Sequence, residues 1–231
     1  MNSKVVIVGA KRTPIGSFQG QFSTVSCDEL GAAAIGGALE QAGLSPDAVD
    51  DVLMGCVLPA GVGQAPARLA SRKAGIPTSA GAVTINKACG SAMKTIQIGH
   101  DQILAGSSEI VVAGGMENMS LAPYLLPKAR SGYRMGHGQT LDHMFYDGLQ
   151  NPDDGLMMGV FGERCAEKFD FTREQQDAFA TASIERALKA MESQFADEIT
   201  PVTVKSRRGE TVVAEDQEPP SCNLEKIPTL R

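Results

Sequence analysis

The strongest constraint on the fold is an alternation of strand-like and helix-like segments that runs from Lys4 to about Gly115. The strand-like segments are short apolar runs rich in β-branched residues, a pattern typical of buried strands. The helix-like segments have apolar residues at helical spacing, and one follows a capping box formed by Ser26 and Glu29. The expected strands are Lys4–Ala10, Asp51–Leu58, 81–86 and Ile110–Ala113, and the expected helices are 30–43, Gly63–Gly75 and Ser91–Ala105. This order predicts an α/β domain with a mostly parallel sheet covered by helices.

The second half of the chain changes character at about Met116. From there to Gly155 the sequence is irregular and rich in Gly, Pro, Asp and Asn, which is typical of a functional loop or an inserted subdomain. Helices are predicted after it at Leu156–Lys168 and Arg173–Phe195, followed by a hairpin that turns near Arg208–Gly209. The second helix begins with a capping box at Thr172 and Gln175. Its expected buried stripe is Phe179, Ile184, Ala187, Leu188, Met191 and Phe195.

Composition excludes several classes of protein. The net charge of −6 and the absence of Trp argue against a nucleic-acid partner, which usually selects a basic surface or aromatic stacking platforms. The N-terminus has no signal-peptide core and no later run reaches the length of a membrane span, so we expect a cytoplasmic protein without a membrane partner. The five cysteines are widely spaced and form no CxxC pair, which predicts free thiols and no metal site.

Cys89 is the residue best placed for chemistry. It lies in "NKACGSAMKT", after the strand-like "AVTIN" and just before the helix expected from Ser91. Unpaired N–H groups and the helix dipole at this position favour a thiolate, and Gly90 leaves room for an approaching group. The arrangement is analogous to the strand–turn–helix elbow that carries a nucleophile in hydrolases. The alternative is that Cys89 is a small buried apolar residue.

No base for Cys89 is evident in the sequence. His100 lies on the same predicted helix, roughly 16 Å along the axis, and cannot reach the thiol. His137 and His143 lie in the irregular region and are interpreted as solvated loop residues. The glycines of "GGMENMS" at Gly114–Ser120 follow a buried strand, where they could let a ligand approach the strand end.

Five segments together resemble the thiolase family, and they cover nearly the whole chain. They are "VVIVGAKRTPIGSFQG", "DDVLMGCVLPAGVGQAPARLAS", "INKACGSAMKTIQIG", "EIVVAGGMENMSLAPYLL" and "MMGVFGERCAEKFDFTREQQDAFATASIERALKA". The resemblance implies a layered α/β fold in which one mixed sheet is covered by helices, with an inserted loop domain. It implies a nucleophile domain at 1–118. It also implies a loop domain at 119–231, which binds coenzyme A, mediates oligomerisation, and can return its last strands to the core.

The resemblance also implies a reaction. Cys89 falls on the family's acyl-accepting cysteine, which would condense two acetyl-CoA molecules to acetoacetyl-CoA and CoA, or catalyse the reverse thiolysis, through an acyl-thioester. Leu149, Met157 and Met158 fall where the family lines the pantetheine and acyl channel. Coenzyme A thioesters are then substrates, and no metal or other cofactor is expected. The family context implies fatty acid metabolism and homodimers or homotetramers.

Two features leave alternatives open. Relatives specialised in short acyl groups often carry His where this chain has Met157, so a broader 3-ketoacyl-CoA thiolase is the first alternative. The family's "GHP"-like, "CxGGG" and "NEAF"-like motifs do not occur. The C-terminal thiolase half is therefore expected to be a missing partner, and the chain alone is expected to lack the base and be inactive. A non-catalytic CoA-binding or assembly fragment is the second alternative. A ketoacyl-synthase relative is disfavoured because it would not share "AGGMENMS".

Overall fold

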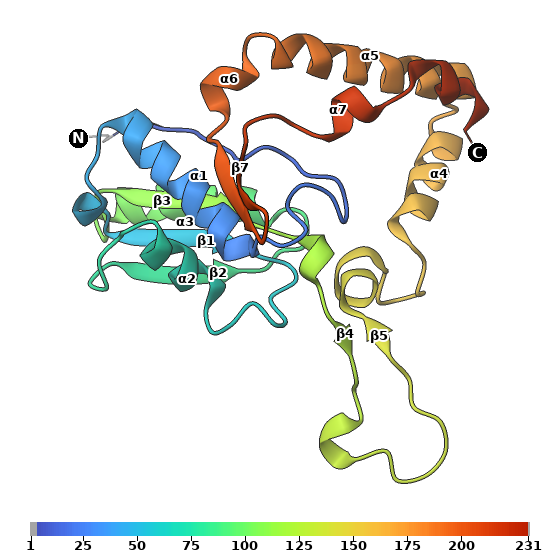
Figure 1. The fold of residues 1–231 in the computed structure, drawn as a ribbon, viewed down its shortest axis with the longest axis horizontal. Helices are drawn as coiled ribbons and strands as arrows, with labels where there is room; N and C mark the ends of the chain where they lie inside the picture. Colours follow the sequence, from blue (N-terminus) through green and yellow to red (C-terminus); the bar gives the residue numbers. More distant parts are fainter. Residues whose placement is uncertain (1–3, 231) are drawn as a thin grey trace.

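A three-stranded parallel sheet forms the centre of the molecule. The computed structural model describes residues 4–230. The strands are β1 (Asp51–Gly55), β2 (Gly81–Ile85) and β3 (Val111–Gly115), in the order β2-β1-β3. β1 is the central strand, and Val52, Leu53 and Met54 are at most 2% exposed. The predicted α/β class with a parallel sheet covered by helices is confirmed (Figure 1).

Three helices cover the sheet: α1 (Cys27–Ala42), α2 (Pro66–Lys73) and α3 (Ser91–Ala105). α2 connects β1 to β2, and α3 connects β2 back across the sheet to β3. Because crossover connections are right-handed and these two run in opposite directions, α2 and α3 lie on opposite faces. α1 packs beside α2, and α3 packs on β1 and β3 (Figure 1). Because α3 follows β2, its first residue and the preceding Cys89 lie at the carboxyl end of the sheet.

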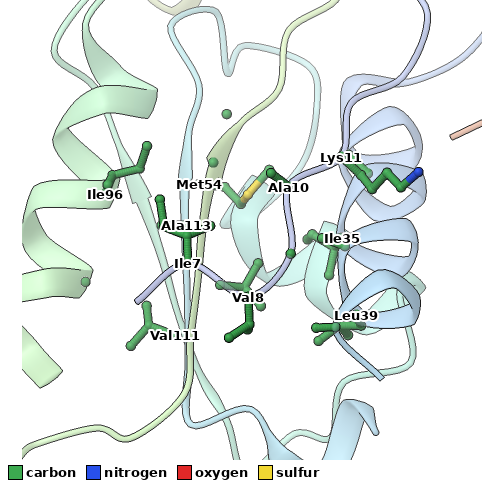
Figure 2. Close-up of a pocket in the computed structure, with 18 of the residues that line it drawn as sticks. Ile7, Val8, Ala10, Lys11, Ile35, Leu39, Met54, Ile96, Val111 and Ala113 are labelled. Atoms are coloured by element: carbon green, nitrogen blue, oxygen red, sulfur yellow. The ribbon is translucent and has the colours of Figure 1, made fainter. Parts of the chain in front are cut away.

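The predicted N-terminal strand is wrong. Lys4–Ala10 is extended but pairs with no strand, and Val6, Ile7 and Val8 are 61–79% exposed. The segment passes beside β3 between α1 and α3, as Figure 2 shows for Ile7 and Val8. It is held instead by the Ala10 N–H, which donates to Gln41 of α1 at 2.7 Å. β-branched composition favours an extended backbone, but a strand also needs an edge to pair with.

Several boundaries differ from the expected ones. β1 ends at Gly55 rather than at Leu58, because the Glu117 carboxylate accepts the N–H groups of Val57 and Leu58. α2 is shorter than expected because it begins at a proline, which is suited to the first helical turn. Both predicted capping boxes are present at the starts of α1 and of the later helix α5 (Arg173–Met191).

The second half is more open than the first. Its elements are β4 (Tyr124–Leu125), β5 (Leu141–Asp142), α4 (Met158–Lys168), α5, α6 (Phe195–Glu198), β6 (Val202–Ser206), β7 (Gly209–Val213) and α7 (Glu218–Ser221). Short 3-10 helices occur at Pro46–Ala48, Met119–Leu121, Ala129–Ser131 and Leu224–Thr229, and a π-helix at Met144–Leu149. β4 and β5 form the base of an arm that projects away from the sheet (Figure 1). The hairpin β6–β7 turns where the sequence predicts.

The predicted buried stripe of α5 is not buried. No residue of α5 is buried, and Phe179 is 76% exposed. The other members of the stripe are half-buried. Helical periodicity identifies an apolar face but not the surface that covers it. Of residues 4–230, no helix is long and apolar enough to cross a membrane.

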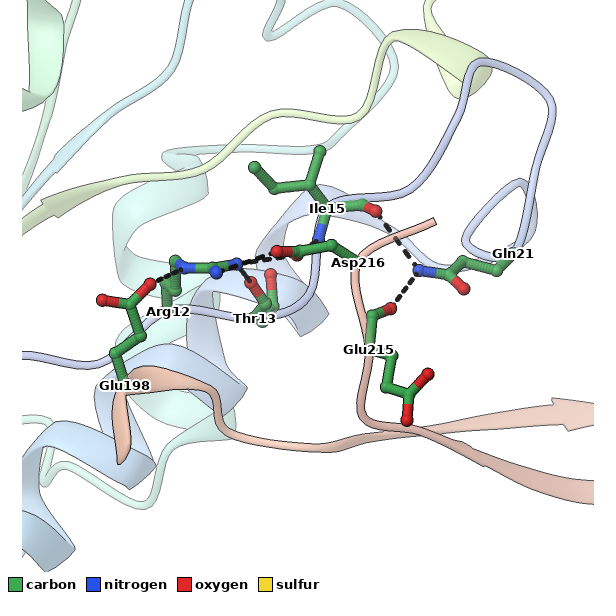
Figure 3. Close-up of polar contacts among 7 residues, drawn as sticks. All are labelled: Arg12, Thr13, Ile15, Gln21, Glu198, Glu215 and Asp216. Atoms are coloured by element: carbon green, nitrogen blue, oxygen red, sulfur yellow. Dashed lines mark hydrogen bonds and ion pairs between the residues drawn. The ribbon is translucent and has the colours of Figure 1, made fainter. Parts of the chain in front are cut away.

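Arg12 connects the N-terminal segment to the chain that follows β7. Its guanidinium forms two hydrogen bonds with Asp216 at 2.8 and 2.9 Å and a third with Glu198 at 2.6 Å (Figure 3). Asp216 is 4% exposed and also accepts the Ile15 N–H at 2.8 Å. The ring of Phe195 lies 4.6 Å from the guanidinium carbon. This cluster joins the N-terminal segment to the chain on either side of the β6–β7 hairpin, and β6 packs on the N-terminal region through a small apolar cluster.

Candidate functional site

Cys89 lies in a tight connection between β2 and α3, in the residues Asn86–Gly90, which we call the elbow. Its side chain is exposed, whereas Ser91, the first residue of α3, is buried. Ala88 has a φ of 46°, in the left-handed region that non-glycine residues rarely adopt. The thiol therefore immediately precedes a helix start, where the N–H groups of the first turn lack helical partners and the dipole favours an anion. The structure places Cys89 where the sequence predicts.

Two glycines form the surface on which α3 begins. Gly55 and Gly115 end neighbouring strands and lie opposite each other in the sheet. A Cβ on Gly55 would lie 2.7 Å from the Cβ of Ser91, and one on Gly115 would lie 2.9 Å from the Cβ of Ala92. The Thr95 hydroxyl adds a hydrogen bond of 3.1 Å to the carbonyl of Gly114. Gly115 therefore leaves room for the first turn of α3. The sequence predicted that the glycines of "GGMENMS" make room for a ligand, and the structure shows that Gly115 makes room for a helix.

Gly55→Ala is expected to lower the free energy of unfolding by about 1–3 kcal/mol, because the new methyl group overlaps the first turn of α3. Neither β1 nor α3 can move easily to relieve this overlap. Urea unfolding measures the change. Gly36→Ala is the matched control, since a Cβ at Gly36 of α1 meets nothing within 4 Å. Replacing a glycine inside a helix there is expected to stabilise by roughly 0.5–1 kcal/mol. Equal effects of the two substitutions would contradict the close approach.

No histidine lies at the elbow. His100 is exposed near the far end of α3 and contacts Asp101 at 3.1 Å, and His137 is exposed. The prediction of a solvated His143 is wrong: it is 5% exposed, and its Nδ1 lies 2.6 Å from the Asp147 carboxylate. Its Nε2 accepts the Ala60 N–H at 3.4 Å. The π-helix places Asp147 one turn from His143, and the chain after β1 covers His143, with Leu58 against Gly148 and the Ala60 N–H on the ring.

Sequence reasoning missed the role of Glu117. Its carboxylate accepts the N–H groups of Val57 at 2.7 Å and Leu58 at 3.3 Å. Burial raises the pKa of Glu117, and these two hydrogen bonds limit the rise. A glutamate placed directly after a buried strand is the signal that could have identified it. Glu117 holds the chain leaving β1, so "MENMS" has a structural role beside the elbow.

The remaining cysteines fall into two groups. Cys27 and Cys56 are buried in the main core, whereas Cys165 and Cys222 are exposed like Cys89. The hydrogen bond that the Cys56 thiol donates to Cys27, together with burial, raises the pKa of Cys56. All five are free thiols. Cys165 is within α4, and Cys222 precedes the short 3-10 helix at Leu224–Thr229, so neither precedes an α-helix or follows a residue with a positive φ.

The predicted channel residues lie in the second half. Leu149 ends the π-helix, and Met157 and Met158 begin α4. A bridge between Gln150 and Met157 places the two groups beside each other. In Figure 1, α4 lies apart from the three-stranded sheet. Among residues 4–230, no hydrogen bond or strand pairing joins these three residues to Cys89.

A separate apolar cavity of about 640 Å³ lies between the N-terminal segment, α1, α3 and β3. In Figure 2, Ile35 and Leu39 of α1 line one side and Ile96 of α3 the other. None of the four predicted site residues lines it. Within residues 4–230, no three His, Cys, Asp or Glu side chains gather in a way that could hold a metal ion. The elbow is therefore the best candidate for chemistry.

The chain is similar to several known proteins. Residues 5–231 match the family model described as "Thiolase, N-terminal domain". The chain is 50% identical over 217 residues to the acetyl-CoA acetyltransferase of Pseudomonas aeruginosa, covering 94% of this chain and 55% of that protein. It is 42% identical to a probable acetyl-CoA acyltransferase of Staphylococcus aureus, covering 99% and 59%. The structure of an acetyl-CoA acetyltransferase from Syntrophomonas wolfei matches with a TM-score of 0.89 and 38% identity, covering 96% and 56%. The chain spans just over half the length of these relatives.

Proposed function

This chain belongs to the thiolase family, and we propose that Cys89 is the nucleophile of a thiolase-type acyl transfer between coenzyme A thioesters. The observation that carries the proposal is the position of Cys89: an exposed thiol on a left-handed elbow at the start of a 15-residue helix. The other two exposed thiols have no such surroundings. The names of the relatives, which are acetyl-CoA acetyltransferases and acyltransferases, support the substrate class.

The proposed cycle has two steps. The Cys89 thiolate attacks the carbonyl carbon of acetyl-CoA, forming a new carbon–sulfur bond while the bond to CoA breaks and CoA leaves as a thiolate that takes up a proton. A second acetyl-CoA then loses a methyl proton to a base, and its carbanion attacks the acetyl-cysteine. The carbon–carbon bond forms, acetoacetyl-CoA leaves, and the Cys89 thiolate is regenerated. The Cys89 backbone N–H is proposed to help stabilise the oxyanion of each step, since the N–H groups of Gly90 and Ser91 already donate to elbow carbonyls.

The base of the second step is proposed to come from outside residues 4–230. His100 and His137 are exposed away from the elbow, and both ring nitrogens of His143 are engaged elsewhere. A partner segment equivalent to the remaining length of the relatives would supply the base. By this proposal the chain alone does not turn over.

The division of labour along the chain is also a proposal. Residues 1–118 would carry the nucleophile, and residues 119–231 would bind coenzyme A through Leu149, Met157 and Met158. The shared core of α1, β1 and α2, together with the packing of α3 on β1 and β3, supports the first part of this division. The projecting β4–β5 arm supports assembly into homodimers or homotetramers (Figure 1). We place the protein in the cytoplasm, in fatty acid metabolism, with coenzyme A thioesters as its substrates and no further cofactor.

The test compares the chain alone with the chain joined to the portion of the Pseudomonas aeruginosa relative that it does not cover. The joined protein is expected to cleave acetoacetyl-CoA in the presence of CoA, and the chain alone is not. Sustained cleavage by the chain alone would contradict the outside base. Assays with longer 3-ketoacyl-CoA substrates decide between an acetyl-specific enzyme and a broader thiolase, the alternative that Met157 favours.

A non-catalytic CoA-binding or assembly fragment is the second candidate. It predicts that Cys89 has no special reactivity. Iodoacetamide labelling of the chain, followed by peptide mapping, compares Cys89 with Cys165 and Cys222 in the same sample. A Cys89 that labels no faster than the other two exposed thiols would favour this candidate.

A further inference from the structure

The elbow contains a strained residue next to the nucleophile. Ala88 precedes Cys89 and has a φ of 46°. A non-glycine residue persists in this region only when surrounding contacts hold it there, and such contacts often occur at functional sites. The contacts that fix Ala88 therefore also fix the direction in which the next residue, Cys89, leaves the chain.

The Ser91 hydroxyl bonds the backbone on both sides of Ala88. It accepts the Lys87 N–H at 2.8 Å and donates to the Ala88 carbonyl at 2.6 Å. The side chain is buried, so water cannot easily replace it. The hydroxyl thus gives the Lys87 N–H a partner, and it adds to the bond of 3.1 Å that the Ser91 N–H already donates to the Ala88 carbonyl.

Asn86 connects the same residue to the frame of the domain. Its Oδ1 accepts the Ala88 N–H at 3.0 Å, and its Nδ2 donates to the Val57 carbonyl at 3.3 Å. The N–H of Val57 in turn donates to the Glu117 carboxylate at 2.7 Å. A continuous series of hydrogen bonds therefore runs from the end of β3 to the elbow.

We propose that Ser91 and Asn86 are positioning residues for Cys89: their side chains hold Ala88 in the left-handed conformation that sets how the exposed side chain of Cys89 leaves the backbone before α3. Neither residue is assigned a contact with the substrate. The inference deepens the proposed function and rests on Cys89 being the nucleophile. Without these contacts Ala88 relaxes toward ordinary backbone angles, and the position of the thiol relative to the start of α3 changes.

The test is the rate of iodoacetamide labelling of Cys89 divided by the rates at Cys165 and Cys222, measured in the full chain by peptide mapping. Ser91→Ala is expected to lower this ratio roughly tenfold, because a displacement of about 1 Å is enough to cost more than that in a reactive site. Ser91→Thr retains the hydroxyl and is expected to restore most of the ratio. Asn86→Ala, at an exposed position, is expected to lower it without preventing folding.

Thr95→Val is the matched control. The Thr95 hydroxyl is buried one turn further along α3 and bonds the carbonyls of Ala92 and Gly114, not the elbow. Three results would each overturn the inference. The first is a labelling ratio unchanged in both Ser91→Ala and Asn86→Ala, the second is an equal fall of the ratio in Thr95→Val, and the third is no restoration of the ratio by Ser91→Thr. Iodoacetamide needs no recognition of coenzyme A. A failed acetoacetyl-CoA assay alongside a responsive labelling ratio would therefore count against the proposed function and not against the positioning role.

Discussion

Cys89→Ser is expected to reduce the cleavage of acetoacetyl-CoA by the joined protein roughly 10⁴-fold or more, a loss typical of removing a catalytic nucleophile. Serine keeps the size of the side chain, but its hydroxyl does not ionise near neutral pH and needs a base to attack a thioester. The measurement is the initial rate of acetoacetyl-CoA loss in the presence of CoA.

The controls for this prediction are Cys165→Ser and Cys222→Ser, which remove the other exposed thiols. Each is expected to change the rate by no more than about twofold, as for surface substitutions away from a site. A Cys89→Ser protein that retains a tenth or more of the rate, or a loss in either control as large as in Cys89→Ser, would disprove the assignment of the nucleophile.

Arg12→Met is expected to lower the free energy of unfolding by about 2–3 kcal/mol at neutral pH. Removing one partner of a fully buried ion pair costs roughly 3–5 kcal/mol, because the other charge stays buried. Arg12 is 29% exposed, which reduces the cost, whereas Asp216 is 4% exposed and would keep only the Ile15 N–H as a partner. Urea unfolding of the chain measures the difference.

The pH dependence of this effect follows from Asp216. Burial alone raises the pKa of Asp216, but the hydrogen bonds from Arg12 and the Ile15 N–H outweigh it, and the pKa is lowered. A carboxylate with a lowered pKa stabilises the folded state above its unfolded pKa of about 4, and this contribution is lost as the pH falls through the folded value. The stability difference between the native chain and Arg12→Met should therefore be full at neutral pH and shrink below about pH 4.

The control is Lys205→Met, which removes an ion pair to Glu210 whose side chains are 79% and 61% exposed. Exposed pairs contribute about 0–1 kcal/mol, so a small loss is expected. An equal loss in Arg12→Met and Lys205→Met, or an Arg12→Met effect that grows as the pH falls, would contradict the account of the Arg12–Asp216 pair.

The elbow was predictable because its determinants are local. A short strand rich in β-branched residues, a connection with Cys89 and a helix from Ser91 follow one another between Gly81 and Ala105, and period and composition identify such elements. The hydrogen bonds of Asn86 and Ser91 also span only a few residues. However, the sequence does not predict the positive φ of Ala88, because alanine rarely adopts one.

The sequence by itself determined the alternating order of strands and helices, the position of Cys89 at a helix start, and both capping boxes, because each depends on neighbours a few residues apart. Only the tertiary structure decided that Lys4–Ala10 remains without a strand partner and that His143 is buried. It also decided that Glu117 holds the chain after β1 and that Arg12 pairs with Asp216, 204 residues away. These outcomes depend on which surfaces meet after the chain has folded, and burial and charge pairing at long range leave no periodic pattern in the sequence.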